Sequence, residues 1–142
     1  MSTALAEKIA IESKQLASVA AWLSDEKKAE NIRVYCVSDV LKLADYFVVV
    51  TGLNRPHVKA ILQELHVRLK AAGEQHTRTE GGDDCWWVLL DYGDVVVHIL
   101  QQEAREYYDL DRLYQECPEL DWTKVERPDV PPAPVKRAPS FD

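Results

Sequence analysis

The stretch Cys85–Leu100, CWWVLLDYGDVVVHIL, constrains the fold more strongly than any other part of the chain. Two apolar runs, Cys85–Asp91 and Asp94–Gln101, flank Tyr92 and Gly93, and a glycine supplies the positive φ that a tight hairpin connection needs. Alternation predicts two faces for the first strand, one with Cys85, Trp87, Leu89 and Asp91 and the other with Trp86, Val88, Leu90 and Tyr92. Because neither face is polar, both must be covered, by helices of the chain or by another molecule.

Hydrophobic periodicity predicts helices and strands in alternation around this hairpin. Helical spacing predicts a long first helix over Ala4–Ala29 and a second helix that Asn54 caps and that ends near Gly73. The remaining expected elements are strands at Asn31–Val37, Ala44–Val50 and Gln75–Thr79 and a short helix at Glu103–Glu116. The strands at Ala44–Val50 and Gln75–Thr79, with the helix between them, predict a right-handed parallel crossover. The fold class is therefore α/β, a mixed sheet of about five strands with helices packed on it in a single domain.

The chain of 142 residues has the size of one domain, but its C-terminal part changes in character. Six of the seven prolines lie at or after Pro118, and Asp129–Pro139 has few side chains that could join a core. We expect a folded domain over residues 1–119 and a proline-rich, disordered tail over 120–142, with Trp122 as the last anchored residue. The three cysteines have no C-x-x-C spacing, which argues against a zinc site and a disulfide framework.

Acidic residues are concentrated in one segment of the chain. Residues 80–121 contain 12 acidic and 2 basic side chains, within a chain of net charge -7. Such a surface repels phosphate, which argues against direct DNA or RNA binding, and it attracts a basic protein. A merely solvated acidic face is the competing interpretation. The N-terminus lacks a long apolar segment and a transit segment, so we expect a cytoplasmic protein that does not bind a membrane.

Two groups of residues could carry chemistry. Thr51, Gly52 and Asn54 lie between a strand and a helix, where free backbone N–H groups favour an anion, but a lone glycine without a following Lys-Ser/Thr is a weak signal. Asp91 and Asp94, with His98 nearby, could hold metal ions, yet acids that flank a turn favour turn-forming roles. We expect no metal and no cofactor.

Aromatic side chains are interleaved with the acidic ones, a combination that is typical of protein interfaces. The hairpin and the segment after it contain Trp86, Trp87, Tyr92, Tyr107, Tyr108 and Tyr114. Burial in the core is the alternative role for about half of them. Alternation predicts that Trp86 faces the core and that Trp87 faces a partner.

Several stretches resemble the ribosomal silencing factor family, also called Iojap-like. They are Ala44–Phe47, Thr51–Gly52, His57–Ile61, Glu80–Gly81, Trp87–His98 and Arg105–Leu110. The run WVLLDYGDVVVH is the most specific, and the match extends in the same order from about Leu5 to Tyr114. The chain departs from the usual family pattern at Leu53–Pro56.

The resemblance implies a nucleotidyltransferase-like fold without the catalytic carboxylates, and hence not an enzyme. It implies a translational repressor that binds the large ribosomal subunit through its L-fourteen-family ribosomal protein and sterically blocks joining of the small subunit. The partner-binding residues that it implies are Trp87, Leu89, Asp91, Tyr92, Asp94, Arg105 and Tyr108. The alternatives are a nucleotide- or phosphate-binding enzyme that uses the Thr51–Asn54 loop, and a homodimer that masks the ribosome site in the free protein.

Overall fold

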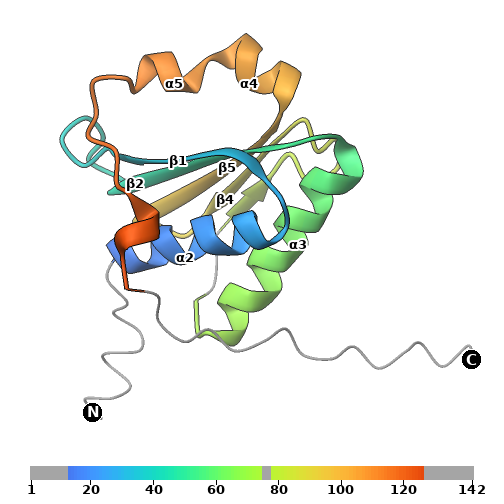
Figure 1. The fold of residues 1–142 in the computed structure, drawn as a ribbon, viewed down its shortest axis with the longest axis horizontal. Helices are drawn as coiled ribbons and strands as arrows, with labels where there is room; N and C mark the ends of the chain where they lie inside the picture. The colour runs from blue at the N-terminus through green and yellow to red at the C-terminus, as the bar shows by residue number, and fades with distance from the viewer. Residues whose placement is uncertain (1–12, 75–77, 127–142) are drawn as a thin grey trace, which may run out of the picture.

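A mixed five-stranded sheet in the order β1-β2-β5-β4-β3 forms the middle layer of the protein. The computed structural model describes residues 13–74 and 78–126. Figure 1 shows α2 and α3 on one side of the sheet and α4 and α5 on the other. The elements are α2 (Ser13–Glu26), β1 (Glu30–Cys36), β2 (Tyr46–Gly52), α3 (Arg55–Ala71), β3 (Arg78–Glu80), β4 (Trp87–Asp91), β5 (Val95–Gln101), α4 (Gln102–Tyr108), α5 (Leu110–Leu113) and the 3-10 helix η1 (Trp122–Lys124).

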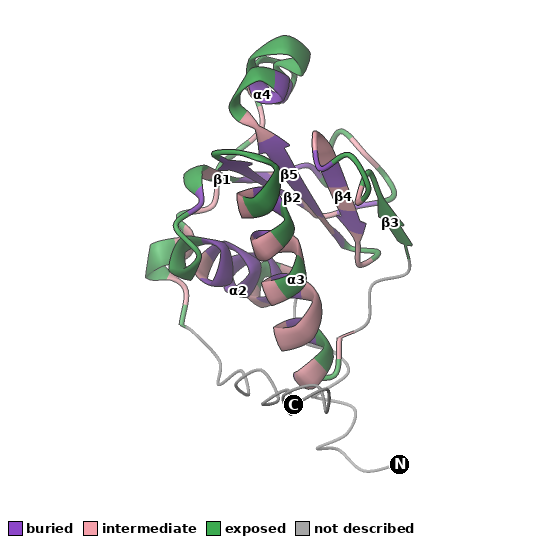
Figure 2. Cartoon of the chain, turned by 90° about the vertical axis from the view of Figure 1, so that its right-hand side faces the viewer, coloured by how far each residue is buried: buried purple, intermediate pink, exposed green. Residues whose placement is uncertain are grey.

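The predicted α/β class, the mixed sheet and the single domain are confirmed. Strand β2 pairs in parallel with β5, while β1 with β2, β4 with β5 and β3 with β4 are antiparallel pairs. Strand β3 therefore runs in the same direction as β2, as the crossover prediction requires, but β5 and β4 lie between them. The physical reason is burial, because the apolar β5 occupies the centre, whereas all of β3 is exposed at the edge (Figure 2).

Helices α2 and α3 cover one face of the sheet with a large apolar core, which we call the first core. The predicted capping of α3 is confirmed, since Asn54 Oδ1 accepts a hydrogen bond from the backbone N–H of His57 at 2.9 Å. Gly73 has the predicted positive φ of 98°. The sheet and helix side chains in this core include Leu23, Val48, Val50, Ile61, Leu65, Val88, Leu90, Val97 and Ile99. The part of the predicted first helix before Ser13 lies outside the described residues.

A smaller second core lies on the opposite face, under α4 and α5. Its buried residues are Tyr35, Val37, Ala44, Phe47, Val49, Leu100, Ala104 and Leu110. The helix predicted over Glu103–Glu116 is divided into α4 and α5 because Asp109 adopts a left-handed conformation with φ 49° and ψ 51°. The divided helix turns along the sheet and covers only part of this face (Figure 1).

The predicted division of the tandem tryptophans between the two faces is wrong. Cys85 has a φ of 52°, so β4 begins only at Trp87 and regular alternation does not extend back to Trp86. Both Trp86 and Trp87 pack against the second core, whereas Cys85 is buried in the first. A hydrogen bond of 2.9 Å from the Gln101 side-chain amide to the Cys85 carbonyl holds this irregular start of the hairpin.

The segment that follows α5 lies along the free edge of β1. The backbone N–H of Cys36 donates to the Pro118 carbonyl, and that of Leu120 donates to the Val34 carbonyl, each at 2.8 Å. Trp122 is anchored, as predicted, by an edge-to-face contact with Trp22 of α2 at 6.4 Å between ring centroids. The division at residues 119 and 120 stays a prediction, and residues 127–142 of the expected tail lie outside the described part.

The three cysteines are unpaired. None of the described helices is long and apolar enough to cross a membrane.

The close packing of α3 on β2 depends on Gly52. A Cβ atom at this position would lie 2.6 Å from Val58 Cγ2, so Gly52→Ala is expected to lower the free energy of unfolding by about 1–3 kcal/mol through overpacking. Urea denaturation measures the change. The control is Gly82→Ala, whose Cβ would meet no atom nearer than 3.8 Å. Equal stability of the two variants would contradict the packing argument.

Candidate functional site

The second face of the sheet is only partly covered, and its uncovered part is the candidate site. We call the side chains of Trp87, Leu89, Val96 and Tyr108 the open sheet face; none of them is fully buried. A groove of about 360 Å³ continues this face toward the loop between β1 and β2. Its apolar lining comes mainly from Leu41, Leu43, Phe47, Leu89 and Val96. Trp87 and Leu89 are therefore brought together, as predicted.

Trp87 is held in place by a histidine and a tyrosine. Its indole Nε1–H donates to Nδ1 of His98 at 3.0 Å, and its ring lies 4.6 Å from that of Tyr108. Because an indole can only donate, the proton of the neutral imidazole resides on Nε2. His98 is 4% exposed, and this burial lowers its pKa to about 4. His98 is thus neutral at neutral pH, and its Nδ1 supports the indole of Trp87.

The two acids of the hairpin have different environments. The Asp91 carboxylate accepts a hydrogen bond from the Gly93 N–H at 2.8 Å and lies 3.8 Å from Arg78, which confirms its predicted role in the turn. The Asp94 side chain is exposed, while its carbonyl accepts from the backbone N–H groups of Asp45 and Tyr46 at 2.7 and 3.1 Å. These bonds tie the turn to the start of β2 and leave the Asp94 carboxylate in solvent.

Arg105, predicted to contact a partner, is instead buried and 4% exposed. Its guanidinium binds both carboxylate oxygens of Asp111 at 2.8 and 3.0 Å and donates to Thr51 Oγ1 at 3.0 Å and to the Asn31 carbonyl. One side chain of α4 thereby joins α5, β1 and β2, an arrangement that we call the arginine clamp. The clamp fixes α4, and α4 places Tyr108 over Trp87.

Tyr92, also predicted to bind the partner, lies on the opposite side of the sheet from the open sheet face. Its ring packs against the first core, on the side of α2 and α3, and burial raises the pKa of its hydroxyl. Strand alternation already predicted Tyr92 and Trp87 on opposite faces; only the resemblance grouped them. Asp94 lies at the turn beside the face, and Tyr108 lies on it with 43% of its surface exposed.

Residues 10–140 match the family described as "Ribosomal silencing factor during starvation". The chain belongs to the ribosomal silencing factor family. It is 36% identical over 108 residues to "Ribosomal silencing factor RsfS" of Bacillus subtilis, a match that covers 76% of this chain and 92% of that protein. A solved structure from Chromobacterium violaceum superposes with a TM-score of 0.72 at 28% identity and covers 89% of this chain and 98% of the other. The family consists of ribosome-associated regulators of translation.

A more distant relative comes from the mouse. It is "Mitochondrial assembly of ribosomal large subunit protein 1" of Mus musculus, 32% identical over 93 residues. The match covers 61% of this chain and 41% of that protein.

Sequence reasoning missed two apolar side chains beside the groove. Val40 and Leu43, in the connection between β1 and β2, are 61% and 90% exposed. They belong to the run VLKL, which has no place in any expected strand or helix. The available signal was the cluster of three apolar residues within a predicted connection, because loops carry functional residues and clustered apolar side chains on a surface mark binding sites.

In the proposed anion-binding loop, backbone N–H groups already donate hydrogen bonds to side chains of the same loop and helix. The Leu53 N–H donates to Nδ1 of His57 at 2.9 Å, and Asn54 already caps the N–H of His57. The departure from the family pattern also has a structural explanation, since Pro56 lies in the first turn of α3, where no N–H is needed. Among the described residues, no cluster of three or more His, Cys, Asp or Glu side chains could hold a metal ion.

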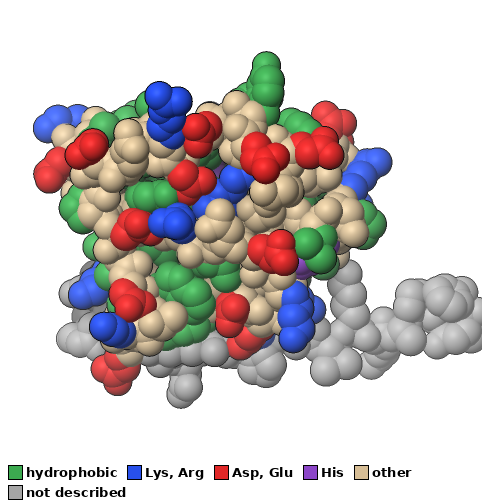
Figure 3. All heavy atoms as spheres, turned by 45° about the horizontal axis from the view of Figure 1, so that its top comes forward, with side chains coloured by type: hydrophobic (Ala, Val, Ile, Leu, Met, Phe, Trp, Pro, Cys, Tyr) green, Lys and Arg blue, Asp and Glu red, His purple; other side chains and the backbone are tan. Residues whose placement is uncertain are grey.

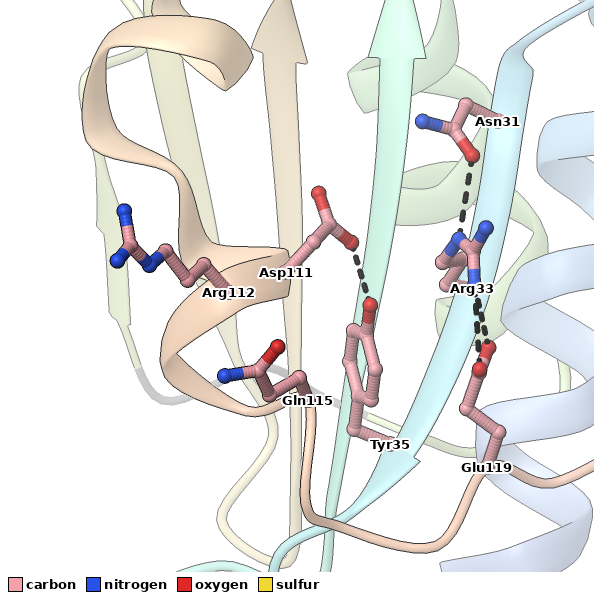
Figure 4. A pocket seen from close by; sticks show the side chains of 7 residues that line it. All are labelled: Asn31, Arg33, Tyr35, Asp111, Arg112, Gln115 and Glu119. Atoms are coloured by element: carbon pink, nitrogen blue, oxygen red, sulfur yellow. Dashed lines mark hydrogen bonds and ion pairs between the residues drawn. The ribbon is translucent and has the colours of Figure 1, made fainter.

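A second pocket, polar and of about 370 Å³, lies between α5 and β1 beside the arginine clamp. Figure 4 shows its main contacts, in which Tyr35 donates to Asp111 and Arg33 binds Glu119 at 3.1 Å. These charged groups neutralise one another, so the pocket extends the polar network of the clamp.

The clamp leads to a prediction about stability. Burial alone would raise the pKa of Asp111, but hydrogen bonds from Arg105 and Tyr35 outweigh it and hold that pKa below its ordinary value. Asp111→Asn leaves the Arg105 charge buried without its partner and is expected to lower the free energy of unfolding by about 3 kcal/mol at pH 7. Glu119→Gln, which breaks the exposed pair with Arg33, should change it by less than about 1 kcal/mol.

The same residue predicts a pH dependence. The stabilisation from Asp111 is present above the ordinary carboxyl pKa and is lost as the pH falls through the lower pKa of the folded state. Denaturation at several pH values should therefore show a smaller loss of stability on acidification for Asp111→Asn than for the wild type. Parallel curves for the two proteins would contradict the assignment.

Proposed function

We propose that this protein is a cytoplasmic translational repressor that binds the large ribosomal subunit through its L-fourteen-family ribosomal protein and blocks joining of the small subunit. The open sheet face is the observation that carries the proposal. Family membership supports the general role, and the name of the mouse relative supports association with the large subunit.

The open sheet face has the composition of an interaction hot spot. Trp87 and Tyr108 are rigid aromatic side chains with polar tips, and Leu89 lies on the same face of β4. His98 holds the indole in a single orientation, so little conformational freedom remains to be lost when a partner covers it. A preorganised apolar face of this kind favours binding to a protein surface.

The surroundings of the face favour a basic partner. Glu103, Glu106, Asp109 and Glu116 are exposed on and around α4 and α5, where Arg112 is the exposed cation. Acidic side chains are spread over the side on which these helices come forward in Figure 3. Ribosomal proteins that contact rRNA are rich in basic residues because they bind phosphate, whereas naked rRNA would be repelled.

The mechanism is steric and requires no bond to be made or broken. While the protein occupies the surface of the large subunit that faces the small subunit, the two subunits cannot join. The extent of repression then depends on affinity and residence time. A homodimer that uses the same face is the competing occupant, and light scattering with and without the ribosomal partner distinguishes the two states.

The decisive experiment measures subunit joining directly. Purified large and small subunits are mixed with and without this protein, and the yield of complete ribosomes is read from a sedimentation profile. Fewer complete ribosomes, with the protein co-sedimenting with large subunits, is the expected result. An unchanged yield at saturating protein would refute the repressor function.

Two substitutions test the open sheet face. Trp87→Glu and Leu89→Glu place a charge where the partner is apolar and should each weaken binding to large subunits by about 2 kcal/mol or more. Leu53→Glu is the control, because Leu53 is also exposed, at 62%, but belongs neither to the open sheet face nor to the lining of the groove. Undiminished co-sedimentation of correctly folded Trp87 and Leu89 variants would exclude this face.

A substitution of Asp94 tests whether acidic side chains attract the basic partner. Its exposed carboxylate should steer a basic partner, so Asp94→Lys is expected to slow association at low ionic strength, with the difference shrinking as salt is added. Stopped-flow or surface-based kinetics at two salt concentrations measure this. An association rate equal to that of the wild type at low salt would show that Asp94 plays no steering role.

A further inference from the structure

The groove extends the interaction surface beyond the residues that the family resemblance implies. One wall is β4 with Leu89, and the other is the loop that carries Val40 and Leu43. Leu43 is 90% exposed, the largest exposed fraction among the large apolar side chains of the described residues. Val40 and Leu43 thus form one exposed apolar patch with the groove, and such contiguous patches mark binding surfaces more often than single exposed apolar residues do.

The floor of the groove is continuous with the open sheet face. Leu89 belongs to both, and Phe47 and Val96 extend the apolar surface toward the loop. His98 also lines the groove, and its ring lies 4.7 Å from that of Phe47. Whatever covers Trp87 and Leu89 therefore meets the groove directly.

His98 provides a second sign that the groove is incomplete in the free chain. Its Nδ1 accepts from Trp87, so Nε2 carries the proton, and this buried donor has no acceptor among the described residues. Buried donors without a partner are rare in folded proteins. The backbone carbonyl groups that accompany an incoming apolar side chain are acceptors of the kind that this donor lacks.

The charged side chains at the opening of the groove indicate which kind of partner side chain binds there. Asp91 and Asp94 lie at the turn, and Lys42 lies on the loop between β1 and β2. Arg78 lies beside Asp91 on β3, 3.8 Å from it and 3.5 Å from Glu80. Charges of both signs nearly cancel here, whereas the surface around α4 and α5 is acidic. An uncharged apolar side chain therefore suits the groove, and a basic protein suits its surroundings.

We propose that the groove between the Val40–Leu43 loop and β4 receives an apolar side chain of the same ribosomal protein that covers Trp87 and Leu89. The interface then reaches from α4 across β4 to this loop. This inference rests on the proposed function, because the partner is the one proposed there.

The experiment compares dissociation constants for purified large subunits. Leu43→Asp changes the rim of the groove, Val96→Phe narrows it from within, and Leu53→Asp is the control on an exposed leucine at the other end of β2. Leu43→Asp and Val96→Phe are expected to raise Kd by about tenfold or more, and Leu53→Asp should leave it unchanged. Because Leu43 is almost fully exposed, its variant should melt at the wild-type temperature.

The outcomes separate this inference from the function on which it rests. In one outcome, Trp87→Glu abolishes binding, while Leu43→Asp and Val96→Phe bind like the wild type. That result would refute the role of the groove and leave the proposed function intact. Reduced self-association of Leu43→Asp with unchanged partner affinity would assign the groove to a second copy and overturn the proposal. A lowered melting temperature with unchanged affinity would assign it to a segment of this chain, with the same consequence. Failure of the wild-type chain to bind would overturn both.

Discussion

The arginine clamp is the interaction on which the arrangement of the second sheet face depends. Helices α4 and α5 are short, and short helices have little stability of their own in water. Arg105 compensates by binding a carboxylate of α5, a hydroxyl of β2 and a carbonyl of β1 from one buried guanidinium. The planar guanidinium suits this role because it can donate hydrogen bonds to several acceptors in fixed directions. The position of Tyr108 over Trp87 follows from it.

The two faces of the sheet are therefore stabilised in different ways. On the first face, the long helices α2 and α3 bury a continuous set of aliphatic side chains, and the hydrophobic effect is the main reason for their placement. On the second, a polar network holds a small cover in place and leaves part of the apolar surface accessible. This asymmetry provides a stable scaffold on one side and an unfilled apolar surface on the other. Such a surface suits a protein that is proposed to act by covering the surface of another molecule.

Much of the fold followed from local patterns. The strand and helix periods, the Asn54 cap, Gly73 after α3 and Gly93 in the hairpin turn were predictable because each reflects chemistry within a few residues. Trp86 was placed on the wrong face because Cys85 adopts a left-handed conformation that interrupts the alternation. Cysteine has no preference for this conformation, so the sequence did not predict it. Asp109 divided the last helix for the same kind of reason. Arg105 was assigned to a partner surface from the resemblance, and local patterns could not correct this because its hydrogen-bond partners lie up to 74 positions away in the chain.

The sequence by itself determined the α/β class, the hairpin, the excess of acid in its second half and the family, because these depend on composition and short-range order. Only the tertiary structure decided which face of β4 is accessible, that Arg105 is a buried tie while Tyr92 lies on the opposite side, and that Val40 and Leu43 border a groove beside Leu89. Exposure is a property of what packs against a residue. It depends on segments that are distant in sequence and come into contact only when the helices pack on the two faces of the sheet.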